Sequence, residues 1–147
     1  MNREIKFKIY ADNKFYDKCL VGNTNNTDDD KWTCSMIWLE DKKEWVHCDN
    51  GIILQYTGLK DKNGVEIYEG DIVKINAHSY DFGFSKDRIG EIRFLEGCFG
   101  FYQQLSEKRY LFKELAKESG YGELEYYEVI GNIFENSELL EERCKDE

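Results

Sequence analysis

Apart from carboxylates, side chains of the types that carry catalysis are scarce in this sequence. It has two histidines, His47 and His78, and no serine stands in a Gly-x-Ser-x-Gly context. No glycine-rich loop leads into the lysine that a phosphate-binding loop needs. Aspartate and glutamate total 30, so one pair suited to acid–base catalysis carries almost no information. We predict no catalytic residue and no enzyme activity; an enzyme with an unrecognised site is the alternative.

Metal ligands do not occur at the usual spacings either. The five cysteines include no Cys-x-x-Cys pair, whereas structural zinc sites use short paired spacings, so a site from Cys34, His47 and Cys48 is not favoured. His47 and Cys48 are adjacent, but strand neighbours point to opposite faces, so adjacency alone makes no reactive pair. The aspartate run within 22–30 could bind calcium, but the glycine and the glutamate of an EF-hand loop are not in register with it. We predict no metal, no cofactor and reduced thiols.

The chain is acidic, and its charge is unevenly distributed. The formal net charge is -10, and residues 96–147 carry 13 acidic and 6 basic side chains, a balance of -7. Nucleic acids are bound chiefly through lysine and arginine on phosphates, so this composition argues against a nucleic-acid partner. Two alternatives stay open: mimicry of a nucleic acid by the acidic third, or a local basic groove. The groove would contain Lys74, Lys86, Arg88, Arg93, Phe94 and Tyr102.

The sequence predicts a cytoplasmic location. No apolar run reaches the ~18 residues that a membrane-spanning helix needs. Residues 1–6 alternate charged and apolar side chains, where a signal peptide would have an unbroken apolar segment.

The first third of the chain predicts β-hairpins. Ile5, Phe7 and Ile9 alternate with polar residues, the period of a half-buried strand, and 11–14 has turn chemistry before a return strand. The stretch 22–30 has no apolar residue and predicts a loop. A second hairpin is expected over 32–45, with a charged turn at 40–43. We expect its tryptophans to be buried in the core; an exposed platform for a ligand is the alternative.

The rest of the chain predicts short strands separated by glycine turns. We expect these strands at 65–68, 72–75, 89–94, 99–102 and 128–134. Apolar spacing predicts an internal helix over 106–119, and Ser137 begins a short final helix. The pattern indicates a mostly-β fold with minor helix: an N-terminal hairpin region over 1–55 and a small antiparallel barrel over 56–147.

One long stretch of this second part has a distinctive order of residues. It runs from Tyr56 to Val73 as YTGLKDKNGVEIYEGDIV, and 89–94 and 128–140 follow it as IGEIRF and EVIGNIFENSELL. With the opening REIKFK of residues 3–8, these segments resemble the YopX family of phage proteins. The resemblance implies a phage or prophage origin, the cytoplasm of a bacterial host, and a C-terminal barrel of the SH3 type. It implies no activity, so no catalytic residue is carried over.

Within this stretch the glycines and Asp71 are predicted to shape turns, since an Asx side chain accepts backbone N–H groups. The alternative is an interaction edge made of Tyr56, Tyr68, Glu69 and Asp71. Taken together, these observations predict a non-catalytic accessory module that binds a protein partner of unknown identity or further copies of itself. An SH3-like module associated with nucleic acid, or an acidic DNA mimic that inhibits a host protein, is the second hypothesis.

Overall fold

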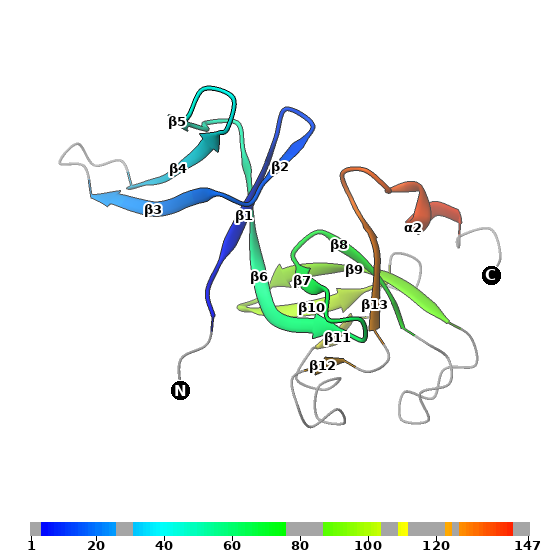
Figure 1. Ribbon diagram of the computed structural model, residues 1–147. Helices are drawn as coiled ribbons and strands as arrows, with labels where there is room; N and C mark the ends of the chain where they lie inside the picture. Colours follow the sequence, from blue (N-terminus) through cyan, green and yellow to red (C-terminus); the bar gives the residue numbers. More distant parts are fainter. Residues whose placement is uncertain are drawn as a thin grey trace. The chain divides into compact units, whose positions relative to one another are not determined.

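The computed structural model describes residues 4–25, 31–75, 87–103, 109–111, 123–124 and 127–142. The chain forms two compact units, Asn2–Tyr56 and Thr57–Glu147, called here the N-terminal and C-terminal units. Most described residues lie in strands, and the described helix is short, α2 (Glu138–Glu142). The predicted mostly-β class with minor helix is therefore confirmed (Figure 1).

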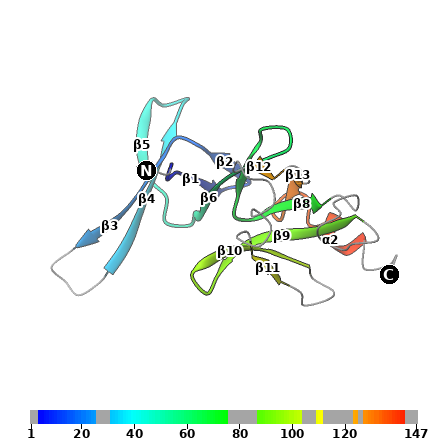
Figure 2. The same ribbon diagram turned by 90° about the horizontal axis from the view of Figure 1, so that it is seen from below.

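The N-terminal unit contains a meander of three strands and a hairpin packed with it. Its strands are β1 (Phe7–Ala11), β2 (Lys14–Tyr16), β3 (Cys19–Asn25), β4 (Lys31–Leu39), β5 (Glu44–His47) and the first part of β6 (Ile52–Asp61). β1 pairs antiparallel with β2 and β6, and β4 pairs antiparallel with β3 and β5. β5 covers only the Met36–Leu39 end of β4, so β3 and β4 continue beyond it as a two-stranded ribbon (Figure 2).

Alternation of side chains builds the core of the N-terminal unit. Its buried members are Ile9, Ala11, Ile37 and Cys48. Partly buried side chains from every second position of β3, β4 and β5 pack against them: Cys19, Val21, Leu39 and Val46. One side of the three-stranded sheet is therefore a core surface, as expected for strands with a period of two.

The C-terminal unit is built on a five-stranded antiparallel sheet that curls into a half-barrel. Its strands are β8 (Asp71–Ile75), β9 (Arg88–Leu95), β10 (Cys98–Tyr102), β11 (Arg109–Leu111) and β13 (Tyr127–Asn132), in the order β11-β10-β9-β8-β13. The end of β6 pairs with β7 (Glu66–Tyr68) and β12 (Glu123–Leu124). The curled sheet is the form that the predicted small barrel takes.

The core of this unit is apolar and closed to solvent. Six side chains form it, each at most 1% exposed: Ile67, Val73, Ile75, Ile92, Phe101 and Tyr127. Each such side chain contributes roughly 1.5–3 kcal/mol by leaving water. Gly90 on β9 is required for this packing, because a Cβ there would lie 2.7 Å from the Phe101 ring and collide with the Tyr102 carbonyl oxygen.

Three sequence-based expectations are corrected. Residues 109–111, placed in a helix over 106–119, form strand β11 and pair with β10; the rest of that segment lies outside the described residues. Residues 22–25 were expected in a loop but form the end of strand β3. Their backbone pairs with β4, and this pairing does not require apolar side chains. A turn was expected from Gly58 onward, yet β6 continues to Asp61, and Gly58 is accommodated at φ 86°.

Candidate protein-binding site

One side of the sheet β3-β4-β5 carries large side chains that are not part of the core. We call this side the tryptophan face and define it by Lys18, Leu20, Met36, Trp38, Trp45 and His47. These residues alternate with the core positions of the same strands, so they lie on the opposite side of the sheet. Leu20 is 53% exposed and Trp45 is 36% exposed. Exposed apolar groups gathered on one sheet surface are typical of a docking surface.

Register places the central residues of this face in one row across three strands. Trp38 on β4 lies directly opposite Trp45 on β5. On its other side, the backbone N–H of Trp38 donates to the carbonyl oxygen of Lys18 at 3.1 Å, which continues the β3–β4 ladder by one residue. In the neighbouring row, Leu20 and His47 flank Met36.

The two indole rings and a lysine contact one another within this row. The ring centroids of Trp38 and Trp45 are 5.4 Å apart with an interplanar angle of 66°, an edge-to-face pair. The ammonium of Lys18 lies 3.9 Å from the centroid of Trp38 and 5.8 Å from that of Trp45. Both distances are within the range of a cation–π interaction. The corner between the two rings thus holds a positive charge.

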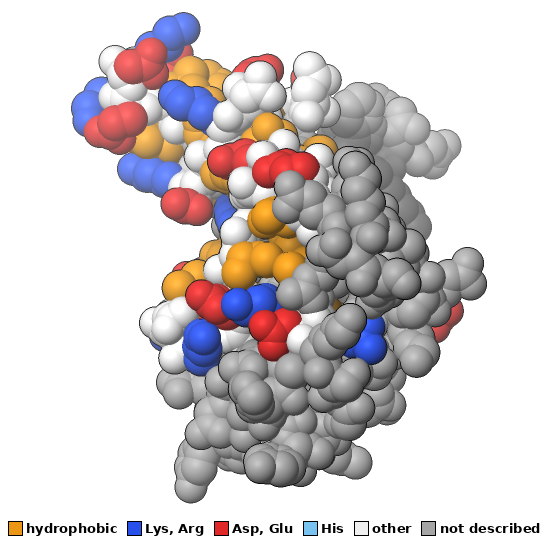
Figure 3. All heavy atoms as spheres, turned by 90° about the vertical axis from the view of Figure 1, so that its right-hand side faces the viewer, with side chains coloured by type: hydrophobic (Ala, Val, Ile, Leu, Met, Phe, Trp, Pro, Cys, Tyr) orange, Lys and Arg blue, Asp and Glu red, His pale blue; other side chains and the backbone are white. Residues whose placement is uncertain are grey.

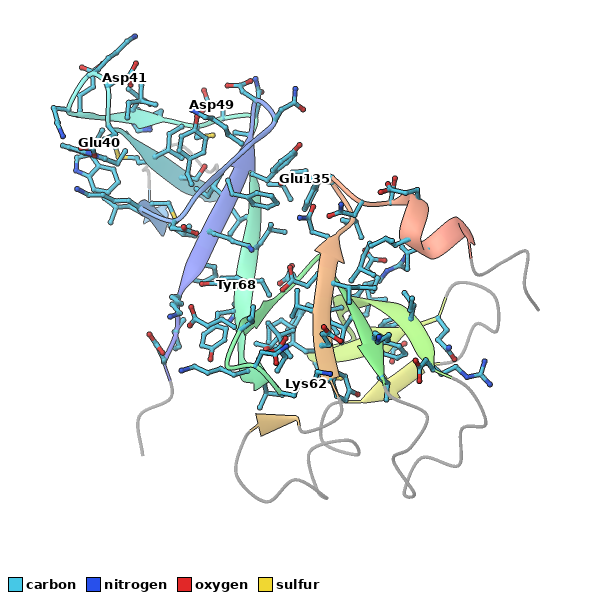
Figure 4. All side chains as sticks on the ribbon, turned by 45° about the vertical axis from the view of Figure 1, so that its right-hand side comes forward. Glu40, Asp41, Asp49, Lys62, Tyr68 and Glu135 are labelled. Atoms are coloured by element: carbon cyan, nitrogen blue, oxygen red, sulfur yellow. The ribbon has the colours of Figure 1, made fainter. Side chains whose placement is uncertain are left out.

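A carboxylate completes the cluster from the β4–β5 turn. The indole Nε1–H of Trp38 donates to Oε2 of Glu40 at 2.7 Å, and Lys43 forms an ion pair with the same carboxylate. Glu40 lies in that turn with Asp41 (Figure 4). The hydrogen bond from Lys43 and then that from Trp38 lower the pKa of Glu40 below its ordinary value. The group next to the indole is therefore an anion at neutral pH.

The structure corrects the expectation that the tryptophans are core residues. Trp38 and Trp45 lie on the side of the sheet away from the buried Ile37, and the side chain of Trp32 lies outside the described residues. The signal that could have revealed this is the alternation of side chains along β4: Ile37 and Leu39 point to one face of the sheet, and Trp38 points to the other. Because apolar residues occur on both faces, the sequence does not show which face is the core side.

The predicted interaction edge has a different environment. Tyr56 belongs to the N-terminal unit, while Tyr68, Glu69 and Asp71 belong to the C-terminal unit. Tyr56, Tyr68 and Asp71 are at most 8% exposed, and Glu69 is partly buried (Tyr68 is labelled in Figure 4). Oδ2 of Asp71 accepts the backbone N–H of Tyr68 at 2.8 Å, which is the turn role that the sequence indicated. The edge stays a prediction.

The predicted basic groove contains carboxylates as well as cations. Arg93 pairs with Glu91 at 2.5 Å and stacks over the ring of Tyr102, and Lys74 lies 3.7 Å from Glu128. Lys86 lies outside the described residues. On the face drawn in Figure 3, lysine and arginine side chains lie beside aspartate and glutamate side chains. Those local carboxylates reduce the positive potential that phosphate binding needs.

Thiol and metal chemistry find little support in the described part of the chain. Cys48 is buried in the N-terminal core while its neighbour His47 is exposed. Burial, and then the charge of Asp17, raises the pKa of the Cys19 thiol, so its reactive thiolate is disfavoured. Within the described ranges, no group of three or more His, Cys, Asp or Glu side chains could hold a metal ion.

Sequence reasoning also missed a buried carboxylate with a structural role. Asp61 is 1% exposed; its Oδ1 accepts the backbone N–H groups of Asn63 and Val65, and its Oδ2 accepts that of Val129 on β13. The next residue, Lys62, donates its N–H to the carbonyl oxygen of Tyr127 at 2.9 Å. Asp61 and Lys62 therefore bind one N–H group and one carbonyl oxygen of β13, those of Val129 and Tyr127.

The fold and the sequence together place the chain in a family. The family model described as YopX protein matches residues 7–141, so the chain belongs to the YopX family. The predicted family resemblance is confirmed.

Two crystal structures resemble this one. Protein EF1440 from Enterococcus faecalis is 23% identical and aligns over 95% of this chain and 99% of its own, with a TM-score of 0.54. Protein yopX from Bacillus subtilis is 18% identical and aligns over 90% of this chain and 95% of its own, with a TM-score of 0.54. At such identities the likeness shows the fold alone. A comparison with curated proteins gave no match. Among the described residues, no helix is long and apolar enough to cross a membrane.

Proposed function

We propose that this chain is a non-catalytic protein-binding module and that its tryptophan face docks a partner protein with a basic surface. The observation that carries the proposal is the exposure of Leu20 and Trp45 on one side of a sheet whose other side is already packed. Covering such side chains removes apolar area from water, at about 25 cal/mol per Å². Tryptophan is also enriched among the residues that dominate binding energy at protein interfaces.

The charge of the chain supports a basic partner. With a net charge of -10, of which residues 96–147 carry -7, the chain as a whole attracts cationic surfaces and repels acidic ones. The YopX resemblance implies that such a partner belongs to a phage or to its bacterial host, and the proposed site of action is the host cytoplasm.

A nucleic-acid role has less support from the geometry. Of the described basic residues in the proposed groove, Lys74 and Arg93 face carboxylates. Arg93, which lies over the ring of Tyr102, is itself paired with Glu91, and this carboxylate opposes the binding of a nucleic-acid backbone.

The test compares one substitution on the tryptophan face with one elsewhere. A partner is first captured from bacterial lysate, identified and purified, and its binding to the intact chain is measured by calorimetry. Leu20→Glu should weaken that binding at least tenfold, since it puts a charge into an apolar contact. Val65→Glu is the matched control, because Val65 is 47% exposed and belongs to the C-terminal unit; it should change binding less than twofold.

Two results would overturn the proposal. One is a purified partner whose affinity is the same for Leu20→Glu and the unchanged chain. The other is a dimer mass by light scattering that Leu20→Glu reduces to the mass of one chain, since the face would then take a second copy.

A further inference from the structure

We infer that Trp38, Trp45 and Glu40 form a binding site for an arginine side chain of the partner, and that Lys18 occupies this site in the free protein. The inference rests on the proposed function and deepens it, because it says which chemical group the tryptophan face recognises. Nothing in it requires a metal, a cofactor or a covalent step.

The geometry of the rings defines the site. Two indoles that meet at 66° with centroids 5.4 Å apart form a corner with two aromatic walls. Such walls attract a cation through the negative faces of the rings, and tryptophan is the strongest of the aromatic side chains in this respect. The ammonium of Lys18, 3.9 Å from one centroid and 5.8 Å from the other, shows which charge the corner accepts.

Glu40 makes the corner more selective for a cation. Its hydrogen bond to Nε1 of Trp38 holds that indole in one orientation, and its carboxylate adds a negative charge beside the rings. The side chain of Glu40 is 72% exposed, so a partner can reach it. A guanidinium offers five N–H donors in a plane, which suits stacking on an indole together with a hydrogen bond to a carboxylate.

Lys18 is suited to be displaced. It is exposed, it lies just before β3, and its ammonium is held by ring faces at the surface. Exposed cation–π contacts contribute only about 0.5–1 kcal/mol. A guanidinium is more weakly hydrated than an ammonium and therefore loses less on leaving water, so a partner arginine can take the place of Lys18.

Two other lysine–aromatic pairs in the N-terminal unit use tyrosine or phenylalanine rings, which attract a cation less strongly than tryptophan does. Lys6 lies over Tyr56 at 4.9 Å, but Tyr56 is only 5% exposed and its ring offers no accessible second wall. Lys8 lies 4.8 Å from the ring of Phe15, whose neighbour is Tyr10, with ring centroids 4.8 Å apart. What marks the tryptophan corner is the carboxylate of Glu40, which accepts the indole N–H of Trp38 at 2.7 Å.

The test uses the full chain, a short peptide and the indole N–H resonances in ¹⁵N-correlated NMR spectra. The probe is acetyl-Leu-Arg-Leu-amide, and its matched control has citrulline in place of arginine, which keeps the shape and removes the charge. Trp38→Phe and Trp45→Phe assign the two resonances. We expect the arginine peptide to shift both resonances at millimolar concentration and the citrulline peptide to shift neither.

A substitution of Lys18, which lies in the corner between the two indoles, gives a second measurement. Lys18→Ala empties the corner and should tighten binding of the arginine peptide about threefold. Lys14→Ala is the control, because it removes the same charge from an exposed lysine of the same unit; it should leave that affinity unchanged within experimental error.

Three results would overturn the inference. The first is an equal response to the arginine and citrulline peptides; the second is an effect of Lys18→Ala no larger than that of Lys14→Ala. The third is no response to the arginine peptide at all. If Leu20→Glu still abolishes binding of the purified partner, the proposed function survives each of these results and only the arginine site is lost.

Discussion

The core cluster of the C-terminal unit has six members, each at most 1% exposed, whereas the core cluster of the N-terminal unit has four buried members, with exposures up to 8%. The C-terminal unit also contains Asp61, a buried carboxylate that accepts three backbone N–H groups. The N-terminal unit instead places two tryptophans on the side of its sheet that faces away from its core.

This difference separates two uses of apolar side chains. In the C-terminal unit they are mostly removed from water and hold the half-barrel together, although Phe94 and Leu95 at the β9–β10 turn are 46% and 44% exposed. Phe94 contacts Phe99, which packs on the core, so its ring also has a structural role. In the N-terminal unit, a sheet three strands wide has one side packed on the core and another that carries Leu20 and Trp45, which we propose to be the binding side.

The largest expected effect on stability is that of Asp61→Ala in the C-terminal unit. It leaves three backbone N–H groups without the acceptor that buried Asp61 provides, and each such loss costs about 1–3 kcal/mol. We expect a decrease of about 3–5 kcal/mol in the free energy of unfolding, measured by urea denaturation with circular dichroism.

Asp49→Ala is the control for this change, because Asp49 is exposed in the N-terminal unit (Figure 4). It should alter the free energy of unfolding by no more than about 0.5 kcal/mol. Similar losses for the two alanine variants would contradict the role assigned to the buried carboxylate.

A pair of glycine substitutions sharpens the comparison between the units. Gly90→Ala brings a methyl group to 2.7 Å from the Phe101 ring, so the free energy of unfolding should fall by about 2–3 kcal/mol. At Gly22 on β3 an added Cβ meets nothing within 4 Å. Gly22→Ala should therefore be neutral or raise the free energy of unfolding by about 0.5 kcal/mol, because alanine lowers the conformational entropy of the unfolded chain. Thermal unfolding measures both; equal melting temperatures would show that close packing at β9 is not required.

The smallest expected effect is a titration on the tryptophan face. Because Lys43 and Trp38 lower the pKa of Glu40, the indole N–H resonance of Trp38 should titrate with a midpoint below 4.5. The stabilisation from these contacts is present above pH 4.5, where the unfolded chain is also ionised, and is lost as the pH falls through the lower folded value. Lys43→Ala should move the midpoint up, and Asp41→Asn should not. A midpoint at 4.5 or above would contradict the arrangement around Glu40.

Much of the C-terminal sheet could be predicted, because its signals are local. Gly64, Glu96 and Gly97 adopt the positive φ that tight turns need, and the apolar runs that the sequence shows outside these turns include β8, β9, β10 and β13. Strand β11 could not be predicted, since the helical spacing of Tyr110 and Leu111 is overridden by pairing with β10, which appears only in the folded sheet.

The candidate site was predictable only in part. The hairpin that carries Trp38 and Trp45 follows from its charged turn, which the structure confirms at Glu40–Lys43. Which side of that hairpin is buried depends on partners far away in sequence, such as Ile9 and Ala11. The contact of Lys18 with the rings depends on the β3–β4 register, which no local pattern specifies.

The hydrogen bonds that Asp61 and Lys62 make to β13 have a consequence for the behaviour of the protein at high concentration. A sheet that does not close into a full barrel has an outermost strand with unused backbone groups, and another molecule can add a strand there and start a fibre. On β13, the Val129 N–H and the Tyr127 carbonyl oxygen are already occupied from within the same molecule. One aspartate and its neighbour thus leave fewer backbone groups on this border for a strand of another molecule to pair with.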